Sequence, residues 1–537
     1  MRFISVILLF GLWVSVAQSA ELRQPAPGAH ALVDVRIVLE PGRVIESGSI
    51  VIRDGVIEAV GTNLTIPADA RVHEFERAEG QDPITIFPGL IEPYYPITLN
   101  SSDDDNGVPP GRHELINPDR RLTARDWPND RVVELRRAGF TTALMVADDG
   151  LLRGSGLIAN LGDHGLSRNL LNAEFGQVAS FDGRASNRQF PGSLMGAVAL
   201  MRQTFADAEW QAAARAAWQR NPAQARPEWL EGVDALAPAL AGRTPLIFES
   251  QDLLDTLRIL EFIEAGSIDL VLVGHGAEYQ RLNALTGRRV PHILPLDFPD
   301  APDVRDENDR NVSLEALRHW DRAPNNPKQL AEAGIPLMMT SHGLSSPGQI
   351  FEKLVKAIDR GLDADLALAA MTTAPADWLG LGDRAGRIRA GAMANLLVVE
   401  GDLLVESPSI SQVWVDGHQY VLAALVPPAI DPAGTWDLTL GLGGMGDVEA
   451  QLVLRGPVSR MEGVLSVMGN DTPLTEVRVS GERVIATIDA SRFGGSGTIS
   501  IRLDVEGDRA RGNGSGPFGE FTVRGRRSAG PDEEESF

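Results

Sequence analysis

The chain has 537 residues, of which 43% are hydrophobic and 23% charged, values typical of a folded globular protein and incompatible with wholesale disorder. Its length corresponds to roughly two to four domains. Its formal net charge is -24, and an acidic surface repels phosphate backbones, which argues against nucleic acid as a partner. The absence of cysteine excludes disulfides, thiolate metal ligands and cysteine nucleophiles.

Residues 1–20 have the pattern of a cleavable export signal. Arg2 supplies the positive charge, residues 3–16 form an apolar run that is short for a membrane span, and residues 17–20 supply small side chains for a signal peptidase. Cleavage is expected after Ser19 or after Ala20. We therefore expect a secreted or periplasmic protein with no membrane contact once the signal has been removed.

The segment after the signal is rich in strands. Residues 31–39 alternate between apolar and polar side chains, and residues 49–60 form a predicted hairpin with an Asp54-Gly55 turn. Residues 85–91 then introduce a buried strand.

The middle of the chain alternates short apolar runs with helical stretches. The strands are expected at residues 141–147, 245–248, 270–273, 292–296 and 336–340, and the helices at residues 195–220, 227–240, 253–264 and 349–360. Repeated strand–helix units predict a parallel sheet, and a closed (β/α) barrel is its natural form at this length.

The C-terminal region returns to strands. Residues 388–420 contain a second Asp-Gly turn, at Asp416-Gly417, and residues 426–432 look like a proline-rich linker. From residue 434 to residue 524 only strands and turns are expected, which predicts a separate antiparallel domain, followed by an acidic tail at residues 532–535. Limited proteolysis is expected to cut near residues 426–432 and release a stable fragment.

Several segments resemble the amidohydrolase superfamily, in particular its exported, imidazolonepropionase-like branch. Residues 50–61 (IVIRDGVIEAVG), followed by residues 87–96 (FPGLIEPYYP), are similar to its opening, and residues 372–402 with residues 413–421 are similar to its closing segment. Three interior stretches are also similar to this branch, at residues 138–161, 230–250 and 269–282.

The resemblance implies an α/β fold: a (β/α)8 TIM-like barrel with a composite N-/C-terminal β-sandwich. The C-terminal all-β domain lies outside it. The predicted organisation is a signal peptide at 1–20, an N-terminal sandwich segment at 21–86, the barrel at 87–385, a second sandwich segment at 386–426, the C-terminal β domain at 433–526 and the tail at 527–537.

The resemblance also implies a metal-dependent hydrolase, whose ligands are a His-x-His pair on strand one, a carboxylated Lys or a Glu on strand four, one His each on strands five and six, and an Asp on strand eight that also acts as general base. In this sequence the His-x-His positions fall on Tyr94 and Pro96. The position on strand five falls on Glu249, that on strand six on His275 and that on strand eight on His342.

The lysine content excludes one of the usual metal ligands. No lysine precedes Lys328, so a carboxylated lysine on strand four is impossible. One interpretation is that the metal site has been lost. The other is a rebuilt site in which Glu249, His275 and His342 hold one divalent ion such as zinc. In either case we expect no binuclear centre, and no cofactor under the first interpretation.

The candidate pocket residues share a position at the carboxyl ends of predicted barrel strands; they are Glu92, Tyr94, Tyr95, Asp148, Glu249, His275 and His342. Asp148 and Asp149 are more readily explained as helix caps. Asp163 and His164 lie in a polar stretch and are expected at the surface.

Three functions are compatible with these observations. The first is hydrolysis of C–N bonds other than ordinary peptide bonds, in a small-molecule substrate. The second is a non-catalytic pseudoenzyme subunit in a hetero-oligomer with an intact amidohydrolase paralogue, and the third is a small-ligand binding protein. A homo-oligomer is compatible with each of them.

Overall fold

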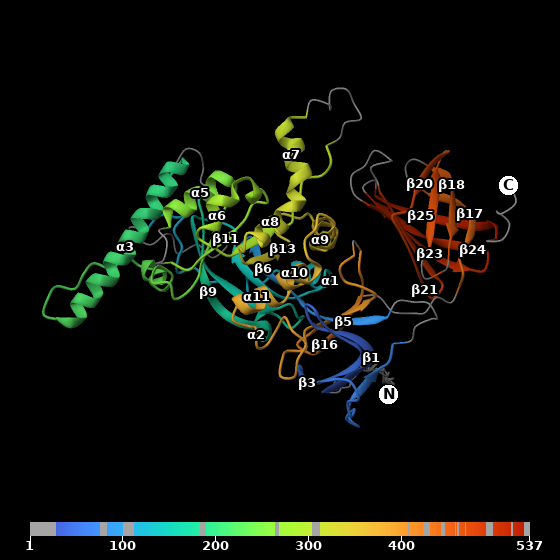
Figure 1. Cartoon of the computed structure of the whole chain (residues 1–537), viewed down its shortest axis with the longest axis horizontal. Coiled ribbons are helices and arrows are strands. Elements are labelled where there is room, and N and C mark those ends of the chain that lie inside the picture. The colour runs from blue at the N-terminus through green and yellow to red at the C-terminus, as the bar shows by residue number, and fades with distance from the viewer. Residues whose placement is uncertain are drawn as a thin grey trace, which may run out of the picture.

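The computed structural model describes residues 28–75, 83–99, 112–182, 190–263, 268–302, 312–405, 407–422, 430–441, 446–456, 458, 461–467, 469–489, 498–516 and 519–530. The predicted export signal, most of the predicted linker and residues 531–537 of the predicted tail lie outside these residues. The tail was predicted to begin at residue 527, but residues 527–529 continue the last strand of the C-terminal domain. Three sheets and the helices around the second of them make up the described chain (Figure 1). No helix among these residues is long and apolar enough to cross a membrane.

The first sheet is composite, because strands from both sides of the barrel sequence build it. Its hydrogen-bonded order is β16-β15-β14-β5-β1-β2-β3, with β4 also paired to β1. Antiparallel pairing of β5 with β14 joins the two halves, and Ile86 lies opposite Val398. Its strands are β1 (Ala29–Glu40), β2 (Arg43–Arg53), β3 (Val56–Gly61), β4 (Arg71–His73), β5 (Ile84–Pro88), β14 (Leu396–Glu400), β15 (Ser409–Val415) and β16 (His418–Val421).

Both Asp-Gly turns form as the sequence predicts, and they pack against each other. Asp54 and Gly55 have φ values of 50° and 83°, and Asp416 and Gly417 have 50° and 75°, as hairpin turns of this kind require. A Cβ atom on Gly417 would lie 2.7 Å from the Cα atom of Gly55. Glycine is therefore needed at both turns for close approach as well as for its backbone freedom.

The second sheet forms the barrel, in the order β13-β12-β11-β10-β9-β8-β7-β6. Aliphatic side chains fill its interior, so it is a packed core and not a pore. The predicted short apolar runs all become strands. The barrel strands are β6 (Leu90–Ile97), β7 (Phe140–Ala147), β8 (Leu152–Asn160), β9 (Leu170–Ser180), β10 (Leu246–Glu249), β11 (Leu270–Val273), β12 (His292–Pro295) and β13 (Leu337–Thr340).

The barrel departs from the predicted (β/α)8 pattern at one strand. β8 runs antiparallel to both β7 and β9, whereas the other neighbouring pairs are parallel. Asp148, Asp149 and Gly150 reverse the chain immediately after β7, with Gly150 at a φ of 100°. The prediction that Asp148 and Asp149 cap a helix is therefore wrong, because a turn and a strand follow them.

The helices of the described chain surround the barrel, except that α3 and α7 extend away from it (Figure 1). Of the predicted helix at residues 227–240, only the end is helical, because Gly232 adopts a left-handed conformation that interrupts it. The α-helices are α1 (Asn129–Arg137), α2 (Leu166–Asn169), α3 (Leu194–Arg220), α4 (Ala237–Leu240), α5 (Leu253–Phe262), α6 (Leu282–Thr286), α7 (Leu314–Arg322), α8 (Asn326–Glu332), α9 (Ile350–Asp359), α10 (Ala364–Met371) and α11 (Thr373–Trp378). The 3-10 helices are η2 (Val233–Leu236), η3 (Glu278–Arg281), η4 (Ala323–Asn325) and η5 (Pro347–Gln349).

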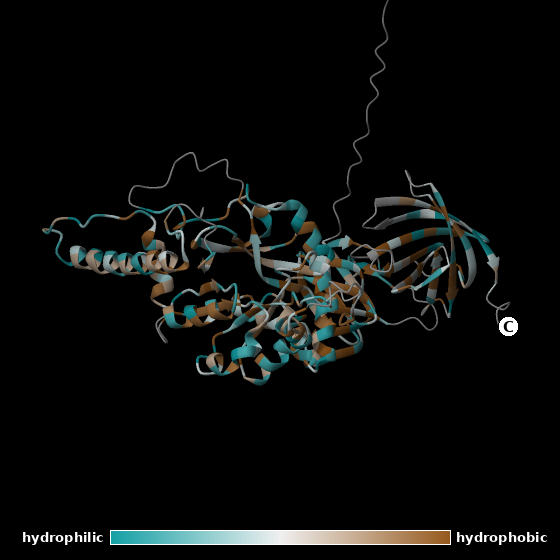
Figure 2. Ribbon diagram, turned by 90° about the horizontal axis from the view of Figure 1, so that it is seen from above, coloured by the Kyte–Doolittle hydropathy of each residue, from teal (hydrophilic) through white to brown (hydrophobic). Residues whose placement is uncertain are grey.

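The third sheet is antiparallel throughout and has its own hydrophobic core, centred on Trp436. It curves strongly and lies apart from the barrel in the view of Figure 2. Its alternating strands place apolar residues inside and polar residues outside, as the sequence predicts for this region. They are β17 (Gly434–Gly441), β18 (Asp447–Arg455), β19 (Glu462–Val467), β20 (Asn470–Pro473), β21 (Glu476–Ser480), β22 (Arg483–Asp489), β23 (Thr498–Glu506), β24 (Arg509–Gly516) and β25 (Gly519–Ala529).

Candidate functional site

Four polar side chains meet at the end of the barrel where the parallel strands finish. Tyr94 comes from β6, Glu249 is the last residue of β10, and His342 follows β13. The fourth is Arg153, the second residue of β8. Because β8 runs antiparallel, its beginning lies beside the carboxyl ends of its neighbours, and this reversal brings Arg153 to the barrel mouth.

Glu249 is the centre of this cluster. Its Oε2 atom accepts hydrogen bonds from Nη1 of Arg153 at 2.6 Å and from the hydroxyl of Tyr94 at 3.2 Å. Its Oε1 atom lies 3.4 Å from Nε2 of His342. Nη1 of Arg153 also donates to the Tyr94 hydroxyl at 3.1 Å. The side chains of Arg153 and Glu249 are only 5% and 11% exposed, whereas that of His342 is 29% exposed.

These contacts determine the charge states in the cluster. Burial by itself would raise the pKa of Glu249, but the contact with His342 and the charge of Arg153 outweigh burial and lower the pKa to about 2. Burial, followed by the nearby Glu249 charge, raises the pKa of the Tyr94 phenol. At neutral pH the site thus holds a carboxylate, a guanidinium and a protonated phenol.

Glu92, a predicted pocket residue, instead closes the barrel. Within the described residues no backbone ladder joins β6 to β13. The fully buried Glu92 carboxylate accepts from the Thr340 hydroxyl at 2.5 Å, and from the amide and hydroxyl of Ser341 at 2.9 and 2.6 Å. The Tyr94 amide is a fourth donor, at 3.2 Å. Burial raises the pKa of Glu92, and these donors oppose that shift.

Two other predicted residues lie near the cluster without joining its hydrogen bonds. Tyr95 is half-buried, and burial raises the pKa of its phenol. Asp148 accepts from the Thr98 hydroxyl at 2.8 Å. Burial by itself would lower the pKa of Arg153, but nearby groups outweigh burial and raise that pKa, and the charge of Asp148 is one of them.

His275, also predicted at the site, belongs to a different group of side chains. Its Nε2 atom is buried and has no hydrogen-bond partner among the described residues, and it lies 3.9 Å from Oε1 of Glu278. Glu278 is fully buried and accepts from the His275 amide at 2.7 Å and from Nδ2 of Asn326 at 2.6 Å. Burial would raise the pKa of Glu278, but His275 and His292 outweigh it and lower the pKa.

The residues present do not fit the metal centre that the fold implies. The proposed single-ion set of Glu249, His275 and His342 does not assemble, because only Glu249 and His342 are in contact. No group of three or more His, Asp or Glu residues in the described ranges is arranged to hold a metal ion. The cation beside Glu249 is the guanidinium of Arg153, whose positive charge opposes a second cation at the same carboxylate.

Sequence reasoning missed Arg153, Thr340 and Ser341. A signal for Arg153 does exist, because it is the lone charged residue in the apolar and small-residue run LLRGSGLIAN at residues 151–160. A charge inside a buried strand needs a partner. The partner itself, 96 positions away at Glu249, is visible only in the folded chain.

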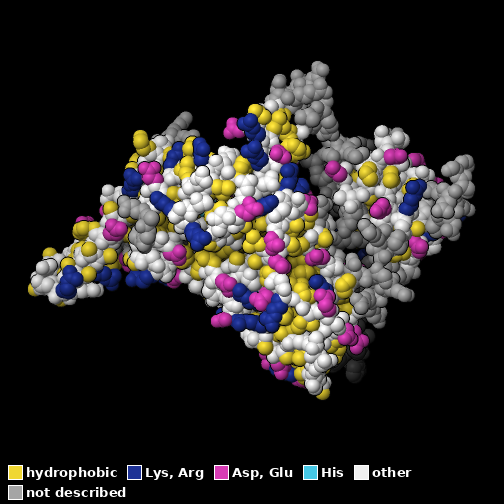
Figure 3. All heavy atoms as spheres, viewed as in Figure 1, with side chains coloured by type: hydrophobic (Ala, Val, Ile, Leu, Met, Phe, Trp, Pro, Cys, Tyr) yellow, Lys and Arg dark blue, Asp and Glu magenta, His cyan; other side chains and the backbone are white. Residues whose placement is uncertain are grey.

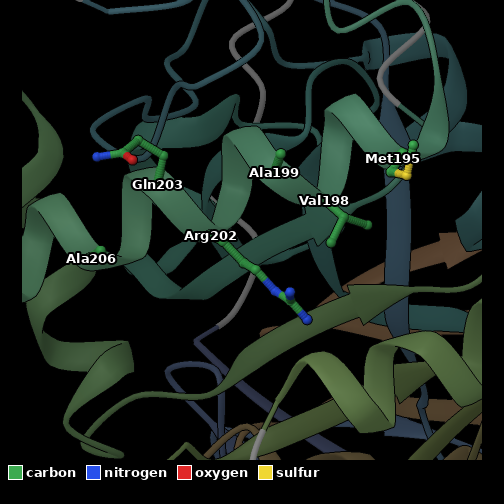
Figure 4. Close-up of a pocket in the computed structure, with 6 residues that line it drawn as sticks. All are labelled: Met195, Val198, Ala199, Arg202, Gln203 and Ala206. Atoms are coloured by element: carbon green, nitrogen blue, oxygen red, sulfur yellow. The ribbon is translucent and has the colours of Figure 1, made fainter.

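The surface also has a groove outside the barrel-mouth cluster. A groove of about 410 Å³ runs along α3, and its lining residues all come from that helix (Figure 4): Met195, Val198, Ala199, Arg202, Gln203 and Ala206. None of the barrel-mouth residues lines it. On the face seen in Figure 3, acidic and basic side chains are interspersed.

Comparisons with known proteins agree with the fold and give its class. The family model described as "Amidohydrolase family" matches residues 322–421. Over 95 residues the chain is 36% identical to the amidohydrolase tasK of Hapsidospora irregularis, a match that covers 18% of this chain and 10% of that protein. The structure of an amidohydrolase from Thermotoga maritima MSB8 is similar with a TM-score of 0.54 at 17% identity, over 72% of this chain and 98% of that one. These matches show that residues 322–421 are similar to the amidohydrolase family and that the fold is similar to that of an amidohydrolase of known structure.

The extent of these matches limits which properties of the matched proteins can be assigned to this chain. The chain spans about a tenth of the curated relative it matches, so that protein's whole activity is not carried over. The match to the solved structure shows the fold alone. The family-model match covers β13 to β16, which includes His342 but neither Arg153 nor Glu249.

Proposed function

We propose that this chain is an exported hydrolase of C–N bonds other than ordinary peptide bonds, acting on a small molecule without the binuclear metal centre usual for its superfamily. Similarity of residues 322–421 to the amidohydrolase family supports hydrolysis, and the signal-like residues 1–20 support export. The observation that carries the proposal is the contact between Glu249 and His342 at the barrel mouth.

This contact makes His342 a candidate general base. An ionised carboxylate is only an acceptor, so the Nε2 atom of His342 donates its proton toward Glu249, and Nδ1 retains its lone pair. Nδ1 has no hydrogen-bond partner in the described chain, and the side chain is partly open to solvent. A water molecule at Nδ1 can therefore lose a proton to the imidazole as it attacks a carbonyl carbon.

Arg153 and Tyr94 support this base without reaching a substrate. Both are buried and directed at Glu249, so they keep the carboxylate ionised and fixed in place. The ionised carboxylate in turn stabilises the imidazolium that forms when His342 accepts the proton. They are positioning residues in this scheme.

A second function is that of a non-catalytic subunit or a ligand-binding protein. It is favoured because the polar groups of the same cluster bind one another and leave few groups for a substrate. Arg153, Tyr94 and Glu249 satisfy one another's hydrogen bonds, and Tyr94 is fully buried. A barrel retained for stability and for binding a paralogue would have the same appearance.

A hydrolysis screen of chelator-treated protein separates the two functions. The substrates are simple amides, lactams and dipeptides, and His342→Ala is compared with His418→Ala, a histidine of β16 in the composite sheet. General-base catalysis predicts turnover that survives chelation and falls about 10²- to 10⁴-fold in His342→Ala alone. Activity abolished by chelation contradicts the proposal. Absence of turnover, with recovery of an intact amidohydrolase paralogue from the native periplasm, supports the second function.

Export has its own test. The mature protein is expected to begin at Ala20 or Glu21, depending on whether cleavage follows Ser19 or Ala20. Terminal sequencing of the protein from its native host measures this directly, and an intact Met1 would contradict cleavage.

A further inference from the structure

Two exposed histidines from distant regions of the chain lie side by side, and His164 lies beyond the opposite end of β8 from Arg153. His164 lies in the loop between β8 and α2, and His418 is the first residue of β16 in the composite sheet. Their Nε2 atoms are 3.3 Å apart, and their rings meet edge to face with centroids separated by 4.7 Å. Both imidazole Nε2 atoms thus converge on one point at the surface.

The loop that carries His164 is held in place by its neighbours. The amide of Asp163 donates to the hydroxyl of Tyr420 at 3.0 Å, and Tyr420 is on the same strand as His418. The guanidinium of Arg136 lies 3.9 Å from the centre of the Tyr420 ring and forms an ion pair with Asp163 at 2.6 Å. The two histidines are therefore positioned by contacts that do not involve the imidazoles themselves.

The other side of the loop is fixed as well. Nδ2 of the buried Asn169 donates to the carbonyls of Gly162 and Gly165, at 2.8 and 2.9 Å. Both carbonyls flank His164. A ligand pair fixed in this way loses little conformational entropy when it binds an ion.

We propose that His164 and His418 together bind one divalent transition-metal ion of the zinc type, with water completing the coordination. Zinc–nitrogen bonds of about 2.0–2.1 Å at a tetrahedral angle place two ligand nitrogens about 3.3–3.4 Å apart. The observed Nε2–Nε2 separation is 3.3 Å, equal to that spacing, and in the absence of an ion one imidazole can hydrogen-bond to the other at this distance.

Charges of both signs surround the pair. Asp416, two residues before His418, supplies a negative charge near the proposed cation, and Arg168 supplies a positive one. Two imidazoles are fewer than the three or four protein ligands of typical zinc sites, so the affinity should be moderate.

A metal ion here would link the barrel to the composite sheet. His164 belongs to the barrel connection and His418 to β16, and the two positions are 254 residues apart. Binding to the folded state alone raises its stability by mass action. The bound ion would thus cross-link these two regions of the fold. Its role is independent of any chemistry at Glu249 and His342.

The test is a titration of chelator-treated, untagged full-length protein with zinc chloride, followed by calorimetry. We expect one ion per chain in the wild type, with binding that weakens as the pH falls because the imidazole ligands must be deprotonated to bind the ion. His164→Ala and His418→Ala should each weaken binding at least about tenfold, whereas His342→Ala and His113→Ala should not.

The outcomes separate this site from the barrel mouth. Zinc should also raise the unfolding midpoint of the wild type and of His342→Ala, but not of His418→Ala. Stoichiometric binding that survives loss of both His164 and His418, or no binding above that of the double variant, would overturn the proposal. Binding lost only in His342→Ala would place the ion at the mouth instead.

Discussion

Removing the guanidinium at the barrel mouth should destabilise the barrel strongly. Arg153→Met deletes a charge whose side chain is 5% exposed and leaves the Glu249 carboxylate, 11% exposed, without its 2.6 Å partner. Breaking a buried ion pair by deleting one member costs about 3–5 kcal/mol. The pKa of about 2 for Glu249, against its usual 4.5, corresponds to about 3 kcal/mol of stabilisation of the carboxylate, to which His342 and Arg153 both contribute.

Replacing both members should restore part of that stability. In Arg153→Met with Glu249→Leu no charge is left unpaired, and the apolar side chains fill similar volume. The buried Tyr94 hydroxyl loses both partners, so we expect a free energy of unfolding about 1–3 kcal/mol below that of the wild type. Arg389→Met is a matched control, because its partner Asp383 is 97% exposed and such pairs contribute at most about 1 kcal/mol.

Differential scanning calorimetry measures these changes. The third sheet has its own core and serves as an internal reference, since its transition should not move. The reasoning is refuted if the free energy of unfolding of Arg153→Met lies within about 0.5 kcal/mol of the wild type, or if the double variant is no more stable than the single one.

The remaining predictions concern acid stability, barrel closure, metal content and proteolysis. Because the folded-state pKa of Glu249 is depressed, its stabilisation is complete above about pH 4.5 and is lost as pH falls toward 2; Glu249→Gln should flatten the melting temperature over that window. Glu92→Ala should cost about 3 kcal/mol, and Thr340→Val less, in urea unfolding, because buried donors lose their acceptor. Elemental analysis of the isolated protein should find fewer than two zinc, manganese or iron ions per chain. Limited digestion with a protease of broad specificity should cut near residues 426–432 and leave a folded C-terminal fragment, and an unfolded fragment would contradict that.

The sequence by itself determined the local features of the fold. Alternation and Asp-Gly pairs predicted the hairpins, short apolar runs predicted the barrel strands, and the resemblance predicted that segments distant in sequence build one composite sheet. The physical reason for the local predictions is that turn conformation and strand burial depend on a few neighbouring residues. The sequence also placed Glu249 and His342 at or just after the ends of strands, where they are found, whereas Tyr94 lies inside β6.

The tertiary structure alone decided which of these residues meet. Reversal of β8 brings Arg153 to Glu249, and the closure of the barrel brings Glu92 to Thr340. His275 was expected with Glu249 but packs against Glu278. Contacts between residues dozens or hundreds of positions apart depend on strand direction and on how the sheet closes, and these are properties of the whole packed barrel that no local pattern records.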